Sequence, residues 1–221
     1  MIDRLRAAVR PVARPLVVAA NKPIATRRAR TALSEAARPV RLEIGGNEER
    51  TGWVVTNVGP FARNYLDATA AWPLEDASVE LVFADNVVEH IPLEGVRAMI
   101  REAYRCLQPG GTIRLCTPDM GKHVELYLKG RQSLEGPEAQ FYKSIGLTVE
   151  HPVDLVRIPV ASFEHWMGYM FDYETLKQEL EAVGFHSVVE CELGKSGVDG
   201  LSGLDDRAGE EGTQMSVEAT R

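Results

Sequence analysis

Residues 74–119 read LEDASVELVFADNVVEHIPLEGVRAMIREAYRCLQPGGTIRLCTPD, and this stretch decides the fold. A short apolar, β-prone run at residues 79–84 ends at the polar pair Asp85 and Asn86. Apolar residues then recur at helical spacing up to Leu107, and the turn sequence QPGG precedes a second apolar run at residues 112–116. Strand, helix and strand in this order predict a βαβ unit of an open α/β sheet, with a ligand site where the strands end.

The flanking segments predict further strands and helices of the same sheet. Residues 42–44 and the glycines after them indicate a first strand, residues 53–58 a second, and residues 65–68 a short third segment. A helix is expected over residues 120–129, and a second over residues 173–183, where Asp172 can cap its start and Gly184 its end.

The end of the chain alternates apolar and polar residues in two further stretches. Residues 185–193 and 214–220 each predict a strand, and Met215, Val217 and Ala219 fall on one side of the second. The connection at residues 194–213 carries six glycines together with Asp205, Asp206 and Arg207. A glycine-rich connection beside a cleft can help to select a substrate.

Several sequence words resemble those of class I S-adenosylmethionine (SAM) dependent methyltransferases. DASVELVFADNVVEHI and IREAYRCLQPGGTIRLCTPD are similar to the family block D-x-S-F-D, H-x-L-E-H, L-x-E-x-x-R-V-L-K-P-G-G and P-D. LEIGGN at residues 42–47 and GWVVTN at residues 52–57 are similar to L-N-x-G-C-G and G-W-x-N-x-D of a group of small predicted methyltransferases. The resemblance implies a Rossmann-like fold with a mostly parallel sheet and an antiparallel last strand, a SAM cofactor and methyl transfer.

The resemblance also implies where SAM binds. The matched positions are the turn after the first strand, the end of the second strand, a loop aspartate and the polar pair after the central strand: Gly45, Gly46, Asn47, Asn57, Asp67, Asp85 and Asn86. Glycine lets the backbone approach a ligand closely, although the same pair also suits an ordinary turn. Asp67 can equally cap a turn.

Two of these positions depart from the family pattern and leave an alternative open. Asn47 stands in place of a glycine, and Asn57 stands in place of the acidic residue that ends the second strand. An amide accepts a hydrogen bond from a ribose hydroxyl but lacks the charge that strengthens it. The alternative to an active enzyme is therefore a catalytically weak or inactive domain that serves as a binding module.

Candidate catalytic residues follow from the same strand ends. His90 matches the family E-H pair and can act as a base for a hydroxyl acceptor, or it can be a structural histidine at the helix entry. Asp119 ends the fifth predicted strand, and His165 lies in an insertion. The five histidines show no metal-ligand spacing such as H-E-x-x-H, so we expect no metal.

Residues 120–171 interrupt the regular alternation and hold seven of the 15 aromatic side chains. We interpret them as an insertion that covers the active site, in which the aromatic residues form a substrate wall or pack on the sheet. The expected acceptor is the hydroxyl of a small molecule or a glycan. The glycan assignment is implied only by the resemblance to proteins associated with polysaccharide and cell-envelope synthesis.

Charge divides the chain into a basic start and an acidic body. Residues 1–41 hold ten basic and two acidic residues, a net +8, which leaves −15 for the rest of a chain whose total is −7. An acidic body argues against a nucleic-acid partner. We therefore predict a basic, partly helical extension over residues 1–40, interrupted by Pro11, Pro15 and Pro23, and a methyltransferase-like domain over residues 41–221.

The extension can pack as an outer helix, contact a protein partner or lie on a membrane surface. Residues 26–37 lack proline and glycine and are its best helix candidate. Three distant cysteines indicate neither disulfides nor zinc, which favours a reducing cytoplasm. The sequence leaves the oligomeric state undetermined.

Overall fold

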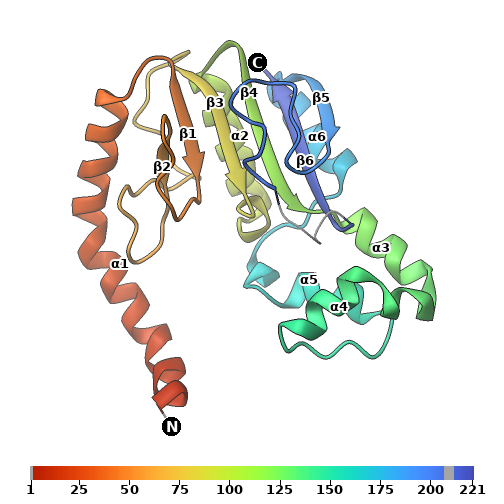
Figure 1. Cartoon of the computed structure of the whole chain (residues 1–221). Coiled ribbons are helices and arrows are strands. Elements are labelled where there is room, and N and C mark those ends of the chain that lie inside the picture. Colours follow the sequence, from red (N-terminus) through yellow and green to blue (C-terminus); the bar gives the residue numbers. More distant parts are fainter. Residues whose placement is uncertain (1, 207–211) are drawn as a thin grey trace.

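The computed structural model describes residues 2–206 and 212–221 and shows one six-stranded sheet (Figure 1). The strand order is β2-β1-β3-β4-β6-β5. β2, β1, β3 and β4 are parallel neighbours, whereas β6 runs antiparallel to both β4 and β5. The predicted fold class is therefore confirmed. The strands are β1 Val40–Ile44, β2 Val54–Thr56, β3 Val79–Asp85, β4 Leu107–Pro118, β5 His186–Cys191 and β6 Gln214–Thr220.

Helices cover one face of the sheet, and the β5–β6 connection crosses the other (Figure 1). α2 and α6 pack on the first face, α1 lies beside the β2 edge, and α3, α4 and α5 gather beyond the end of β4 (Figure 1). The α-helices are α1 Ile2–Glu35, α2 Leu93–Cys106, α3 Met120–Leu128, α4 Pro137–Ser144, α5 Asp154–Ala161 and α6 Tyr173–Val183. The 3₁₀ helices are η1 Val88–His90, η2 Gly130–Glu135 and η3 His165–Met167.

The central β3–α2–β4 unit forms as its periodicity predicts. The buried stripe of α2 includes Val96, Met99, Ile100 and Ala103, all 0% exposed. β4 begins at Leu107, earlier than predicted, and the glycine turn lies inside it as an irregularity in the β3–β4 pairing. The helix therefore passes directly into the strand.

The last helix and strands also confirm their predictions. Asp172 caps α6 by accepting a hydrogen bond from the Thr175 backbone N–H at 2.8 Å, and Gly184 ends it with a φ of +117°. β6 is buried on both faces, because the preceding connection covers the side that carries Ser216 and Glu218. Residues 207–211, which include Arg207 of the glycine-rich connection, lie outside the described residues.

The prediction that prolines interrupt the N-terminal segment is wrong. α1 is one helix over residues 2–35, and it includes most of residues 26–37, the best helix candidate of the extension. Ala25, Ala29 and Leu33 are buried, and the Ala25 carbonyl accepts a hydrogen bond from the Tyr65 N–H at 3.1 Å. No helix among the described residues is long and apolar enough to cross a membrane.

The short third strand predicted at residues 65–68 is reduced to a single bridge. Asn57 and Tyr65 pair in parallel, with no ladder beyond them. The segment is held instead by its bond to α1 and by the ring of Tyr65, which lies 4.8 Å from the Lys22 ammonium. β2 is therefore the edge of the sheet within the described part of the chain.

Candidate active site

The turn after β1 requires glycine at both positions. Gly45 has a φ of +82°, and a Cβ there would lie 2.3 Å from the Val87 side chain. A Cβ on Gly46 would lie 2.5 Å from Val55 and 2.6 Å from the Glu43 carboxylate. The glycines therefore let the turn pack tightly between β2 and the segment after β3, which brings the two loops together.

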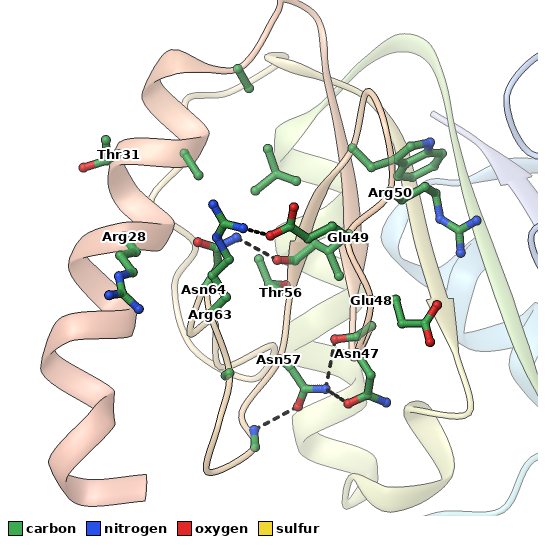
Figure 2. Close-up of a pocket in the computed structure, with 18 of the residues that line it drawn as sticks. Arg28, Thr31, Asn47, Glu48, Glu49, Arg50, Thr56, Asn57, Arg63 and Asn64 are labelled. Carbon is green, nitrogen blue, oxygen red and sulfur yellow. Dashed lines mark hydrogen bonds and ion pairs between the residues drawn. The ribbon is translucent and has the colours of Figure 1, made fainter.

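Asn57, at the end of β2, holds this turn in place (Figure 2). Its side-chain N–H₂ donates to the Gly45 carbonyl at 2.9 Å, the Gly46 carbonyl at 3.1 Å and the Asn47 side-chain oxygen at 3.1 Å. Its own oxygen accepts from the Gly59 N–H at 2.9 Å. One amide thus joins the two loops that the sequence assigns to the cofactor.

A cavity of about 1320 Å³ opens between α1 and the β2 edge, with Asn47 and Asn57 at one end (Figure 2). The nine residues between β1 and β2 contain no helix, although parallel strands are usually joined through about a dozen residues or more. α1 lies across from this short connection, and the space between them remains open. The ion pair Arg63–Glu49 lines the cavity, as does Arg50, which pairs with Glu43.

Asp67 lies in a turn beyond the Asn57–Tyr65 bridge. Its carboxylate accepts hydrogen bonds from the Thr69 N–H at 3.0 Å and the Thr69 hydroxyl at 2.7 Å. The turn-capping reading of this residue is therefore confirmed, and a ligand role for it remains a prediction.

Asp85 and Asn86 end β3 next to the glycine turn. Asp85 is half-buried, whereas Asn86 is exposed and adopts a left-handed φ of +49°. The Asn86 N–H donates to the Cys116 carbonyl of β4 at 2.9 Å. Val87 then contacts Gly45, so the first and third strand ends of the predicted site are adjacent.

The structure brings Glu89, His90 and His165 together beside the ends of β3 and β4. The possible ligand atoms of the three side chains all lie within 4.8 Å of one another. Glu89 is 0% exposed, accepts a hydrogen bond from the Thr117 hydroxyl at 3.0 Å, and has its pKa raised to about 7 by burial. Sequence reasoning missed this set because 75 positions separate His90 from His165.

The two histidines differ in exposure but touch each other. Their ring centroids are 4.6 Å apart, with His90 exposed and His165 buried. Burial lowers the pKa of both imidazoles, and the neighbouring His165 lowers that of His90 further. His165 Nδ1 lies 2.6 Å from the Pro159 carbonyl oxygen. Because a carbonyl only accepts, Nδ1 carries the proton and Nε2 carries the lone pair.

Asp119 lies at the end of β4 and caps α3. Its carboxylate accepts from the backbone N–H of Gly121 at 2.7 Å and that of Lys122 at 3.4 Å, and it is only 5% exposed. Burial raises its pKa above the ordinary value. The geometry shows a structural function for Asp119, while the predicted catalytic function stays a prediction.

Some aromatic residues of the insertion pack in the interior, and others are exposed and could form the predicted substrate wall. Phe171 and Tyr142 are 0% and 3% exposed and pack in cores, whereas Trp166 is 70% exposed and Phe163 44%. Phe163 and Glu164 both have left-handed φ values, 59° and 67°, directly before His165. Non-glycine residues in this region are strained and recur at functional sites. The exposed part of the insertion therefore lies next to the histidine pair.

A comparison with protein families finds a match over the middle of the chain. Residues 54–115 match the family model of the methyltransferase domain. No curated protein matches the chain.

Solved structures resemble the chain at low sequence identity. A SAM-dependent methyltransferase from Archaeoglobus fulgidus has 14% identity and a TM-score of 0.48, with 94% of each chain covered. CurJ carbon methyltransferase has 16% identity and a TM-score of 0.46, with 86% of this chain covered. Human N-acetylserotonin methyltransferase, solved in complex with SAM, has 14% identity and a TM-score of 0.45, with 89% of this chain covered. The chain spans only 50% and 51% of the last two proteins.

The parallel sheet with one antiparallel strand and polar loops at its carboxyl edge defines a Rossmann-like ligand-binding domain. The family match lies within the stretch that carries the predicted resemblance to the class I SAM-dependent methyltransferases and confirms that resemblance.

Proposed function

We propose that this protein transfers a methyl group from SAM to a hydroxyl of a small molecule or glycan. The observation that carries the proposal is that two sets of polar residues lie at the same edge of the sheet. The Gly45–Asn57 loops lie at the ends of β1 and β2, and the Glu89, His90 and His165 side chains lie at the ends of β3 and β4. Donor and acceptor would then bind side by side across this edge.

The loop residues fit the donor. Gly45 and Gly46 are half-buried, so the turn presents backbone to which the amino acid end of SAM can come close. The Asn57 oxygen accepts a hydrogen bond from the Gly59 N–H, and an amide oxygen has two lone pairs, so it can also accept from a ribose hydroxyl. Asp67 and Asp85 would take the adenine side, with Gly46, Asn47 and Asn86 completing the walls.

The chemistry requires alignment more than a reactive protein group. SAM supplies an activated methyl group, and holding the acceptor oxygen in line with it accounts for much of the rate. His90 is exposed at the site and has a lowered pKa, so its imidazole is neutral at pH 7 and can accept the hydroxyl proton. His165 packs against it and positions the ring, and Asp119 would border the acceptor side.

The exposed aromatic side chains of the insertion fit the acceptor. Phe163 and Trp166 lie on either side of His165 in sequence, and both side chains are exposed. Flat apolar faces suit one side of a sugar or of a small cyclic alcohol, while the histidines contact its hydroxyl. We propose a cytoplasmic setting for this reaction, with the basic segment of α1 as the contact to any protein or membrane surface.

One observation favours the second candidate, a binding module without activity. The Asn57 N–H₂ group is committed to the turn, and its oxygen already has one partner. Calorimetry with the full chain and SAM separates the two. Stoichiometric binding supports the enzyme, whereas no heat and no thermal stabilisation at millimolar SAM would overturn the proposal.

The role of His90 gives the first prediction. His90→Ala should lower turnover by roughly 10²–10⁴-fold, the usual contribution of a general base, while SAM affinity stays nearly unchanged. Methyl transfer to small-molecule and glycan extracts with labelled SAM is the assay, and calorimetry with SAM is the control. Loss of folding stability with unchanged turnover per folded molecule would assign His90 to structure instead.

A further inference from the structure

Glu89, His90 and His165 form a cluster whose chemistry is wider than proton transfer. One carboxylate and two imidazoles come from two segments, η1 and η3, and their possible ligand atoms lie within 4.8 Å of one another. We propose that these three side chains bind a divalent transition-metal ion of the zinc class. This inference does not depend on the proposed methyl transfer, and it departs from the absence of metal that the histidine spacing led us to expect.

The spacing suits such an ion after a small closure. Zinc binds nitrogen and oxygen at about 2.0–2.2 Å in a tetrahedral arrangement, which places ligand atoms roughly 3.4 Å from one another. The longest separation in the cluster therefore has to shorten by about 1.4 Å. His90 is exposed and can turn toward the two buried members without repacking the core.

Each ligand is already oriented by a second partner. His165 donates Nδ1–H to the Pro159 carbonyl at 2.6 Å, which leaves Nε2 as its metal-binding atom. His90 is hydrogen-bonded to the backbone of Glu164, and the Thr117 hydroxyl donates to the Glu89 carboxylate at 3.0 Å. Metal-binding histidines almost always donate their other ring N–H in this way, and metal-binding carboxylates are hydrogen-bonded too.

The backbone around the cluster is closely fitted. A Cβ on Gly168 would lie 1.9 Å from the Glu89 carbonyl oxygen, so only glycine lets η3 approach η1 this closely. Phe163 and Glu164 adopt strained left-handed conformations just before His165. The fold thus holds two distant segments together where their side chains converge.

The ligand set favours zinc-class ions over magnesium or calcium. Two imidazoles suit zinc, copper, iron and nickel, whereas magnesium and calcium prefer oxygen ligands. Three protein ligands also leave one tetrahedral position for a water or a hydroxyl. A bound ion would occupy the lone pair that His90 needs as a base, so ion and proton compete for this side chain.

The test uses the full chain, freed of metal with a chelator and titrated with Zn²⁺ in the absence of SAM. Calorimetry should show one Zn²⁺ per chain. Co²⁺, used as a coloured substitute, should give the intense visible absorption of a tetrahedral site with nitrogen and oxygen ligands. His90→Ala and His165→Gln should each weaken Zn²⁺ binding by at least the 10–100-fold that loss of a supporting partner costs a metal site.

His186→Ala is the matched control, because His186 is an exposed histidine on β5 outside the cluster, and it should bind Zn²⁺ as the wild type does. Circular dichroism without metal confirms that each variant is folded, and the exposed His90 provides a variant that leaves the core intact. The proposal is overturned if the wild type binds no Zn²⁺, or if His90→Ala binds it as tightly as the wild type. Methyl transfer is not measured here, so failure of the metal site leaves the proposed function standing.

Discussion

Asn57 supports the first glycine turn through its N–H groups, which an aspartate cannot replace. Although acid is the usual residue at this position in the family that the chain resembles, Asn57→Asp would place a carboxylate against the carbonyls of Gly45 and Gly46. We expect a loss of about 1–3 kcal/mol in the free energy of unfolding, because two half-buried carbonyls lose their donor. Urea titration measures this loss, and calorimetry should show weaker SAM binding.

Asn47→Asp provides the matched comparison. Asn47 contributes only an oxygen to the same network, by accepting from the Asn57 N–H₂ at 3.1 Å, and a carboxylate keeps that acceptor. We therefore expect stability close to that of the wild type. If the two variants unfold at the same urea concentration, the donor role of Asn57 is wrong.

His123 gives a prediction for the pH dependence of stability. It is 1% exposed on α3, its Nδ1 lacks a partner in the described structure, and burial lowers its pKa to about 4 from an ordinary 6.5. Between pH 6.5 and 4 the unfolded chain binds a proton that the folded chain does not. Stability from this group is therefore lost as the pH falls, by about 1.4 kcal/mol per pH unit and roughly 2 kcal/mol at pH 5.

His123→Gln should remove the part of the pH dependence of stability that comes from His123, because glutamine retains a donor and does not titrate. Urea unfolding from pH 7.5 to 5 gives the slope for the wild type and for the variant, and the exposed His186, changed to glutamine, controls for loss of a histidine. Equal slopes for the wild type and His123→Gln would contradict the assignment.

At the scale of elements, the β5–β6 connection is fastened to the sheet by one buried arginine. Arg114 on β4 is 0% exposed and pairs with Asp205 at 2.8 Å and with Glu218 on β6. It also donates to the Lys195 carbonyl at 3.0 Å. Arg114 thus joins β4, β6 and the connection that covers them.

Arg114→Met should lower the free energy of unfolding by about 3–5 kcal/mol, because two buried carboxylates lose their partner. Thermal and urea unfolding measure the loss. Arg97→Met removes a surface ion pair with Glu179 and should have a much smaller effect. A similar loss in both variants would show that burial of the Arg114 ion pairs does not increase their contribution to the free energy of unfolding.

The elements also show which local patterns decide structure. α2 and α6 were predictable from local sequence. Both have apolar residues at helical spacing, and α6 is also capped by Asp172 and Gly184; these signals act within a few residues. α1 was not, since its helix passes through three prolines and is held by contacts with the segment after β2. The expected third strand was also wrong, because its residues bind α1 as well as the sheet edge.

An ion pair on α2 shows how a helix and a distant loop are joined. Glu102 and Arg105, three residues apart on α2, form an ion pair at 2.8 Å. Glu102 also accepts from the Trp72 N–H at 2.7 Å, and Arg105 donates to the Leu74 carbonyl at 2.9 Å. The pair therefore tethers the loop before β3, and this follows from helical spacing together with the loop contacts.

At the scale of the whole molecule, the candidate site combines segments that are far apart in sequence. Gly45 touches Val87 after β3, and Glu89 meets Thr117 at the end of β4 and His165 in the insertion. The strand ends of a parallel sheet meet at one edge, so the sheet itself brings together the segments that we propose for donor and acceptor.

The sequence by itself determined the sheet class, the central βαβ unit, the family resemblance and the loops at the strand ends. These depend on local periodicity, caps and turn residues, which act over a few positions. Only the tertiary structure decided that Asn57 holds the glycine turn, that Arg114 is buried, and that His165 lies against His90 with Glu89 beside them. Those contacts join residues from 10 to 104 positions apart, and packing of whole elements sets them.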